Sequence, residues 1–365
     1  MAVGHIGVVG AGLAGLATAL AAAQAGIRVE LFEARSESAL GFAHIDVVPN
    51  LLRSLVALGL GDACVRRGFP YSGLAIIDSN GRRHDELPTP RLAGLQWPPA
   101  MGMAYGDLLE VLRQAALKNG VHMHGTTRVV DVREGRVIVT EGGARHPVDL
   151  AVVASGSFLP LLDGSPARPV QLDVLPLQCC YALLPRPHTL NRASWIIGKG
   201  SLRALQVPVD HRRAGVAVIK AGDGPTDHAS IRVALGEQGP LLKDLAAYWP
   251  DDSRWVQRPV SSGVLAGPWH ERGVLRVGSS AHPLVPHFGQ AAAQSAEDAV
   301  VLGALLRNKL DRDALLDTFT ARRSARVQRV HAVTAQAARW QLRPEAKTDL
   351  RALAEQLAPL VAEPV

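Results

Sequence analysis

Cysteine is scarce in this 365-residue sequence, which contains only Cys64, Cys179 and Cys180. The last two are adjacent and therefore poorly placed to bond each other. No Cys-x-x-Cys pair and no Cys/His spacing typical of a metal site occurs. The cysteines therefore predict no disulfide framework and no metal ligands. Reduced, buried thiols in a cytoplasmic protein are the expected state.

Blocks of like charge are also missing. The sequence has 39 Lys and Arg against 33 Asp and Glu, a formal net charge of +6, and no run of basic residues. This balance does not indicate a nucleic-acid partner. A composition of 47% hydrophobic and 20% charged residues is typical of a globular protein. The modest positive field favours an anionic small substrate.

The first 27 residues lack Asp, Glu, Lys and Arg altogether. The segment Leu13–Ala23 could pass for the core of a signal peptide, but no basic residue precedes it. The glycines at positions 7, 10, 12, 15 and 26 of this N-terminal region are typical of a strand, a turn and a helix, and atypical of a membrane helix. No later stretch is apolar for long enough to cross a bilayer, so no membrane span is predicted.

The N-terminal region carries a glycine motif in a specific context. His5–Val9 is predicted to be a buried parallel strand, Leu16–Ala25 a helix with Gly26 as its C-terminal cap, and Arg28–Glu33 a second strand ending in an acid. Between the first strand and the helix lie Gly10, Ala11, Gly12, Leu13, Ala14 and Gly15. This arrangement predicts a dinucleotide site, and the motif alone leaves NAD and FAD open.

Each part of the motif has a mechanical reason. Gly10 makes the tight turn, Gly12 lets the backbone approach a pyrophosphate, and Gly15 lets helix and strand pack closely. The helix N-terminus offers free N–H groups to the phosphates. Glu33 is placed to accept hydrogen bonds from a ribose diol.

A second strand–loop–helix unit lies far along the chain. Val274–Gly278 is predicted to be a buried strand, and Ala291–Leu306 a helix that carries Glu297 and Asp298. The loop between them contains His282, Pro283, Pro286, His287, Gly289 and Gln290. Such a unit again directs a helix N-terminus at a ligand.

The two units together resemble the single-component, FAD-dependent aromatic monooxygenases, a family that includes para-hydroxybenzoate, salicylate and 6-hydroxynicotinate hydroxylases. The family pattern is Gly-Asp-Ala-x-His-Pro, then Gly-Gln-Gly, then a helix with Glu-Asp-Ala. This sequence has Gly278-Ser279-Ser280-Ala281-His282-Pro283, Gly289-Gln290-Ala291 and Glu297-Asp298-Ala299. The resemblance implies an α/β fold: a Rossmann-like FAD-binding domain with an inserted β-rich substrate domain and C-terminal helices.

Four positions depart from the family pattern. Ser279 replaces the acid that holds a ribityl hydroxyl of FAD, and Tyr105 replaces an arginine shortly before the Asp-Leu-Leu helix. Ser155 and Leu162 stand where a middle motif carries Asp and Arg. Loss of one charge-assisted hydrogen bond at Ser279 costs roughly 1.5–3 kcal/mol, about a tenfold to hundredfold weakening.

The resemblance also implies the site residues. FAD is the implied cofactor and NAD(P)H the co-substrate. The implied cofactor contacts, besides the first glycine motif, are Glu33, Arg35, Tyr105, Val129, Ser279, Pro286, Gly289 and Gln290. His44 is a candidate proton acceptor, or else an ordinary histidine bonded to backbone. Pro283 is the second catalytic candidate, because its carbonyl can face the substrate. His282 is expected to shape the loop at the flavin, His287 is a weaker candidate, and Tyr181 lines the pocket or belongs to the core.

The domain organisation is predicted to be discontinuous. Residues 1–75, 100–165 and 265–340 form the FAD-binding domain, residues 76–99 and 166–264 the substrate domain, and 341–365 a helical tail. A hairpin is predicted around residues 78–81, strands at 177–184, 192–197, 202–207 and 215–220, and helices at 227–247 and 313–358. Arg322, Arg323, Arg326 and Arg329 are interpreted as a solvated basic face, with subunit or membrane contact as the alternative.

The predicted function is hydroxylation of a small aromatic or polyketide-like compound with NAD(P)H and O₂, through a flavin C4a-hydroperoxide as the resemblance implies. Two alternatives stay open because of the four departures. One is a divergent member with weak or no FAD binding in a non-redox role, such as an isomerase or binding partner. The other is a flavin oxidoreductase without oxygen insertion. A monomer or homodimer is expected.

Overall fold

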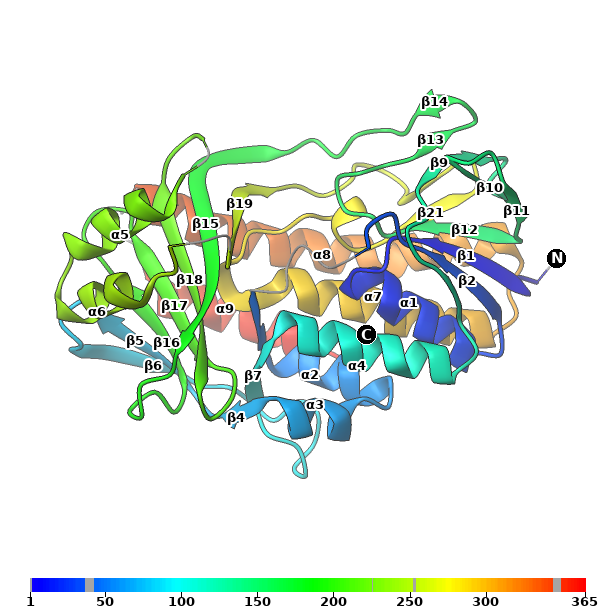
Figure 1. The fold of residues 1–365 in the computed structure, drawn as a ribbon. Coiled ribbons are helices and arrows are strands. Elements are labelled where there is room, and N and C mark those ends of the chain that lie inside the picture. Colours follow the sequence, from blue (N-terminus) through cyan, green and yellow to red (C-terminus); the bar gives the residue numbers. More distant parts are fainter. Residues whose placement is uncertain (1, 37–42, 225, 252–253, 344–348) are drawn as a thin grey trace.

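The computed structural model of the chain describes residues 2–36, 43–224, 226–251, 254–343 and 349–365. Figure 1 shows two β-layers joined by long elements. The first is a six-stranded sheet in the order β20 (His270–Glu271), β21 (Val274–Arg276), β12 (Leu150–Val153), β1 (His5–Val9), β2 (Arg28–Phe32) and β8 (His122–His124). All neighbouring pairs are parallel except β20 with β21.

Alternation along the central strands decides what covers each face of this sheet. Ile6 and Val8 pack toward the helices α1 (Leu13–Gln24), α4 (Tyr105–Lys118) and α7 (Gln290–Arg307). Val9 and Phe32 pack toward a five-stranded sheet on the other face. That sheet has the order β11 (Arg145–Pro147), β10 (Val137–Thr140), β9 (Val129–Arg133), β13 (Leu161–Leu162) and β14 (Ser165–Pro166). A strand with both faces covered is expected to be apolar, which is the pattern of residues 6–9 in β1 and of the whole of β12.

The second layer is a seven-stranded, largely antiparallel sheet. Its order is β19 (Trp255–Ser262), β15 (Asp173–Pro185), β18 (Arg213–Ala221), β17 (Arg203–Pro208), β16 (Ala193–Ile197), β5 (Leu74–Asp78) and β6 (Arg83–Leu87). Helices α5 (His228–Gly236) and α6 (Pro240–Tyr248) cover one face of it with an apolar cluster of their own. This is the β-rich layer that the resemblance predicts.

Smaller elements connect the two layers. A three-stranded sheet has the order β3 (His44–Val47), β7 (Ala100–Ala104) and β4 (Phe69–Tyr71). Along the chain, helices α2 (Pro49–Ala57) and α3 (Gly61–Arg67) connect β3 to β4. Helix α8 (Arg312–Leu342) contacts both α7 and β15 and ends before α9 (Leu350–Ala362). Two short 3₁₀ turns, η1 (Gly278–Ser280) and η2 (His287–Gly289), precede α7.

The predicted secondary structure is confirmed in its main elements. The hairpin at residues 78–81 joins β5 and β6, and the four predicted strands of the second layer are β15, β16, β17 and β18. Fold class is confirmed too, since a parallel sheet with helices carries an inserted β-rich layer and C-terminal helices. The domain boundaries given above stay a prediction. Within the described residues, no helix has the length and apolar character needed to cross a membrane.

The interpretation of the arginines on α8 was wrong for two of the four. Arg322 and Arg329 are exposed, but Arg323 and Arg326 are buried. Arg323 donates to Asp298 Oδ1 at 2.8 Å and to Glu297 Oε2 at 3.1 Å, and Arg326 Nε donates to Glu297 Oε2 at 2.9 Å. The two acids of α7 therefore require two cations from α8, because an unpaired buried charge is costly.

Candidate functional site

The first glycine motif forms a turn whose space is open on one side. Gly10 has a φ of +100° and its N–H donates to the carbonyl of Phe32 at 2.8 Å. A Cβ at Gly15 would lie 1.7 Å from the Gly10 carbonyl oxygen, so helix and turn are in direct contact there. A Cβ at Gly12 would meet no atom within 4 Å. The turn thus leaves free space where the motif predicts a pyrophosphate.

The N-terminus of α1 faces that space without an acid or a side-chain cap. Gly12 is the N-cap residue and has no side chain to cap the helix, and the first turn contains no acidic residue. The N–H of Leu13 donates to the hydroxyl of Tyr105, which begins α4. The tyrosine hydroxyl keeps its own proton for a second acceptor. Backbone donors and a positive helix end are the usual partners of a phosphate.

Glu33 is fixed at the end of β2, beside the glycine turn. Its Oε2 accepts from the N–H of Ala11 at 2.8 Å, and its Oε1 accepts from the N–H of Arg35 at 2.9 Å. Its carbonyl accepts from the N–H of Thr127 at 2.7 Å, which brings the segment leading to Val129 against it. A carboxylate held by two backbone donors still has lone pairs for a ribose diol. Arg35 has a side chain 56% exposed, and Val129 begins β9.

The second motif touches the first. Gly278 has a φ of +57°, and a Cβ there would lie 2.6 Å from the Cβ of Ala14 in α1. Two segments far apart in the sequence therefore meet at the start of α1. Ser279, the position of the missing acid, is exposed next to this contact. Its hydroxyl is free to reach a ligand but brings no charge.

The buried carboxylate of Asp298 fixes the loop of the second motif through contacts with two of its residues. The N–H of Gly278 donates to Asp298 Oδ2 at 2.9 Å, and His282 Nε2 lies 2.7 Å from the same oxygen. Burial acts to raise the pKa of Asp298, but the charges of His282 and Arg323 outweigh it and hold the pKa of this carboxyl below its usual range. His282 is itself buried, so its side chain supports the loop from inside the protein.

Two residues with left-handed backbone conformation immediately precede α7. Phe288 has a φ of 61° and Gly289 one of 65°, and Gly289 caps the helix without a side-chain bond. Pro286 precedes them, and its carbonyl accepts from the N–H of Gly289 at 3.2 Å. The side chain of Gln290 turns inward, because its Oε1 accepts from Asn50 Nδ2 at 3.1 Å. At this end of α7, backbone groups remain for a ligand.

The two catalytic candidates have different surroundings. His44, the first residue of β3, is buried against β18, where a Cβ at Gly215 would lie 2.1 Å from the His44 Cβ. Burial lowers the pKa of His44 to about 4, so the ring is neutral at pH 7 and only a weak base. The carbonyl of Pro283 accepts from the N–H of Gly263 at 2.9 Å, which leaves one lone pair for a substrate.

The remaining candidates have other partners, and one of them, Ser155, also lies against the glycine turn, where a Cβ at Gly10 would be 2.9 Å from the Ser155 Cα. His287 is buried and its Nε2 lies 2.7 Å from Gln341 Oε1 on α8. Tyr181 is half-buried on β15, with its ring 6.0 Å from that of His44. Ser155 bonds the carbonyl of Phe158, and Leu162 is buried with the apolar cluster under β9. At these two positions the side chains serve local packing.

Two groups near the site were missed in the sequence. Asp46 on β3 accepts from the hydroxyl of Tyr71, and its carbonyl oxygen lies 3.7 Å from where a Gly289 Cβ would be. Burial raises the pKa of Asp46 to about 6, although the bond from Tyr71 acts the other way. The alternation of β3 is the signal that could have found Asp46, since an acid between Ile45 and Val47 stands out in a short apolar strand.

Arg258 on β19 is the second missed group. It is exposed, and the backbone pairing of β19 with β15 places it opposite Cys179. Burial raises the pKa values of Tyr105 and Tyr181, and the charge of Arg258 acts against that rise at both tyrosines. One cation therefore lies within electrostatic reach of the α1 N-terminus and of the second β-layer. A single arginine in a strand gives no sequence signal of such a position.

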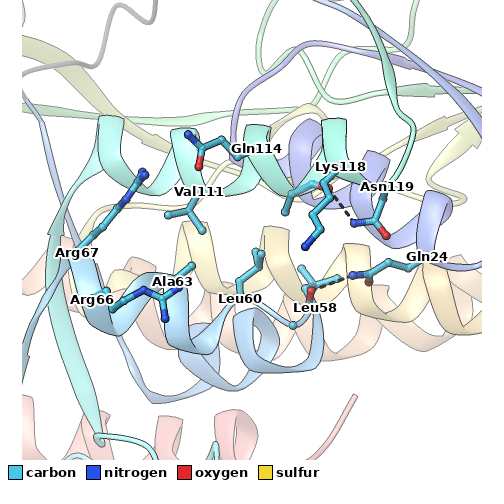
Figure 2. A pocket seen from close by; sticks show the side chains of 12 residues that line it. Gln24, Leu58, Leu60, Ala63, Arg66, Arg67, Val111, Gln114, Lys118 and Asn119 are labelled. Atoms are coloured by element: carbon cyan, nitrogen blue, oxygen red, sulfur yellow. Dashed lines mark hydrogen bonds between the residues drawn. The ribbon is translucent and has the colours of Figure 1, made fainter.

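A cavity of about 550 Å³ lies elsewhere, among helices α1 to α4. Figure 2 shows Lys118, Arg66 and Arg67 around it, with Gln24 bonded to the carbonyl of Leu58 at 3.0 Å. Gln24 is the last residue of the 12-residue helix α1, so the cavity is about 18 Å along that helix from the glycine turn. This basic cavity is therefore separate from the dinucleotide site.

Comparison with known proteins agrees with this geometry. The chain matches the family of FAD dependent oxidoreductases over residues 73–295 and an FAD binding domain over residues 4–141. It is 28% identical over 352 residues to an FAD-dependent urate hydroxylase of Klebsiella pneumoniae, covering 88% of this chain and 86% of the relative. It is 25% identical over 356 residues to a 6-hydroxynicotinate 3-monooxygenase of Bordetella bronchiseptica, covering 89% and 90%.

Solved structures show the same fold. The crystal structure of Klebsiella pneumoniae HpxO with FAD and uric acid superimposes with a TM-score of 0.82 at 20% identity, covering 99% of this chain and 97% of that one. The residues of this site fit FAD, because they form an open glycine turn, two helix N-termini without side-chain caps and a carboxylate at Glu33 held by backbone donors. The chain belongs to the FAD-dependent oxidoreductases, and its relationship to the FAD-dependent aromatic monooxygenases is confirmed.

Proposed function

We propose that this protein is an FAD-dependent monooxygenase that hydroxylates a small aromatic compound with NAD(P)H as electron donor. The observation that carries the proposal is the contact between Gly278 and Ala14, which brings the two halves of a flavin site together at the start of α1. Relatives named as a 6-hydroxynicotinate 3-monooxygenase and a 3-hydroxybenzoate 6-hydroxylase each cover 89% of the chain.

The chain's own residues would hold FAD at several points. The N–H groups at the start of α1 bind the pyrophosphate across the space beside Gly12, and Glu33 accepts from the ribose diol of the adenosine half. Ser279 offers a hydroxyl to the ribityl chain. The N-terminus of α7, which has no side-chain cap, would offer backbone donors and a positive dipole end to the flavin. When bound and reduced, the flavin supplies the oxygen chemistry, while the protein orients the substrate and excludes water.

The pocket chemistry favours a substrate with an ionisable oxygen. Arg258 supplies a cation between the glycine turn and the second β-layer, and the net charge of the chain is positive. Asp46, with a pKa near 6, is suited to accept a proton from a ring hydroxyl at neutral pH. His44 is neutral at pH 7, and with a pKa of about 4 it is the weaker base of the two. An aromatic acid or phenol fits these groups.

The setting of the enzyme is part of the proposal. The three cysteines are free and buried, which supports a reducing, cytoplasmic environment. A monomer or homodimer without a nucleic-acid partner agrees with the dispersed charge. The four departures from the family motif favour looser FAD binding than in its relatives.

The test begins with the visible spectrum of the purified protein after incubation with FAD. A flavin spectrum, and oxidation of NAD(P)H stimulated by an aromatic acid, are the expected results. Mass spectrometry of the product formed under ¹⁸O₂ then separates hydroxylation from simple oxidation. Uptake of one labelled oxygen supports the proposal, whereas NAD(P)H oxidation that never labels a product indicates an oxidoreductase without oxygen insertion.

A matched pair of variants locates the cofactor. Glu33→Gln is expected to weaken FAD and ADP alike but to leave riboflavin affinity unchanged, because only the first two carry the adenosine ribose. Glu141→Gln, at an exposed carboxylate, serves as control. Full FAD affinity in Glu33→Gln would contradict the placement, and failure of the wild type to bind FAD would favour a non-redox role.

A further inference from the structure

Glu30 lies where three histidines from separate segments converge. Its Oε2 is 2.8 Å from His124 Nε2 and 3.1 Å from His146 Nδ1, and its Oε1 is 3.0 Å from His5 Nε2. The side chains of Glu30, His124 and His146 are 17%, 21% and 22% exposed, so the group is sheltered but open to ions from solvent. Neither the flavin site nor the catalytic candidates include any of these residues.

Strand register and sheet packing create this meeting point. Glu30 and Phe32 alternate on β2 and are paired with His122 and His124 of β8, so their side chains share one face of the six-stranded sheet. The five-stranded sheet covers that face. A Cβ at Gly7 would lie 2.2 Å from Ile138 Cδ1, so the two sheets are in close contact. His146 on β11 is paired with Ile138 on β10, so the same packing places His146 over Glu30.

An aromatic wall holds the two nearest histidines. The ring of Phe32 stacks on His124 at 4.5 Å between centroids, with 5° between the planes, and meets the ring of His146 edge-on at 4.9 Å. These contacts restrict the rings and direct one nitrogen of each toward Glu30. A site whose ligands are already oriented loses little entropy when an ion binds.

We propose that Glu30, His124 and His146 bind a divalent transition-metal ion of the Zn²⁺ type. One ligand atom from each lies within 4.8 Å of the other two. Zinc bonds of about 2.0–2.1 Å in a tetrahedron require ligand atoms roughly 3.3 Å apart. The two oxygen–nitrogen distances of 2.8 and 3.1 Å need only a small expansion, and the two imidazole nitrogens lie within 4.8 Å of each other. Imidazole nitrogens with one carboxylate suit zinc and its neighbours, and water from the solvent side completes the shell.

His5 serves as an outer partner in this arrangement. Its Nδ1 lies 2.8 Å from a nitrogen of Arg28, and a guanidinium can only donate, so the His5 proton sits on Nε2. That N–H faces Glu30 Oε1. The contact of 3.0 Å lacks the alignment of a hydrogen bond, so His5 lies beside the second carboxylate oxygen as an outer neighbour of the site.

The ion would join three segments of the chain beneath the flavin site. The carbonyl of His124 accepts from the N–H of Glu33 at 3.0 Å, so β8 is tied to the ribose-binding carboxylate. Glu30 is three residues before Glu33, about 10 Å along the strand, which is too far for the metal to touch a cofactor held at Glu33. The site is therefore a structural one that clamps β2, β8 and β11.

Zinc titration of full-length, tag-free protein after removal of metals by a chelator tests this site. Calorimetry is expected to show one Zn²⁺ per chain in the wild type, and at least tenfold weaker binding in His124→Asn and in His146→Asn. His188→Asn, at an exposed histidine outside the cluster, is the matched control and should bind as the wild type does. Circular dichroism verifies that each variant is folded.

Thermal unfolding gives a second readout that does not require variants of the histidines. Zn²⁺ should raise the melting temperature of the wild type, reversibly with EDTA, but not that of Glu30→Gln, because an ion bound only to the native state stabilises it. Absence of Zn²⁺ binding by the wild type would overturn the proposal. Equal binding in the two cluster variants and the wild type would also overturn it, since the ion would then lie elsewhere.

Discussion

Replacement of Arg323 by Met is expected to destabilise the protein severely. This guanidinium is fully buried and donates to Asp298, Glu297 and Gln294 through four hydrogen bonds of 2.8–3.1 Å. Arg326 would still pair with Glu297, but Asp298 would keep only His282 and the Gly278 N–H. Removal of one partner from a buried ion pair costs about 3–5 kcal/mol, a large part of a total stability of about 5–15 kcal/mol.

The neighbouring arginine is the matched control. Arg322 is exposed, so Arg322→Met should change the free energy of unfolding by no more than about 0.5 kcal/mol. Urea unfolding followed by circular dichroism would compare the two variants, with equal slopes required for the comparison. The buried network would be refuted if the two substitutions cost the same within about 1 kcal/mol. Arg323→Met should also weaken FAD, because Asp298 holds the Gly278 loop.

Three further predictions concern the cofactor and pH. Gly12→Val should abolish FAD binding at an unchanged melting temperature, because its φ of −74° suits any residue and its Cβ meets no atom; normal FAD affinity by fluorescence titration would contradict this. Ser279→Asp should tighten FAD about tenfold to hundredfold by restoring a charged acceptor, and an unchanged or weaker affinity would show a site rebuilt around serine. Burial lowers the pKa of His287 to about 4. Its folded-state pKa lies below the unfolded value, so its contribution is complete above about pH 6.5 and is lost as pH falls toward 4, at a cost of about 3 kcal/mol. Urea midpoints should therefore fall less steeply between pH 6.5 and 4.5 in His287→Gln, and parallel pH curves for the two proteins would count against it.

The parts of the fold that could be predicted have local causes. The glycine turn follows from the left-handed backbone at Gly10 and from the contact of Gly15 with the Gly10 carbonyl, five residues away. The strands of the second β-layer follow from alternation, and the hairpin between β5 and β6 from its turn residues. Glu33 could also be predicted locally, because it follows the second strand of the same strand–turn–helix–strand unit that contains the glycine turn.

The parts that could not be predicted depend on partners far apart in sequence. Arg323 was interpreted as solvated because its partners Glu297 and Asp298 belong to another helix. A signal was present, since two adjacent acids in an otherwise apolar helix imply buried cations. The cluster at Glu30 gave no signal, because its histidines come from three strands of two sheets and have no characteristic spacing.

The strand order of the six-stranded sheet has a consequence for biosynthesis. The chain leaves the sheet after Val153 in β12, and the strand that pairs with the free edge of β12 is β21, which begins only at Val274. At about 5–20 residues per second, the ribosome needs roughly ten seconds to make the segment between them. During that time one edge of β12 has no strand paired with it, and such an exposed edge can pair with another chain and promote aggregation. The second half of the proposed flavin site, from Gly278 to the start of α7, is made late in synthesis, so we expect FAD to bind only after this segment has been made.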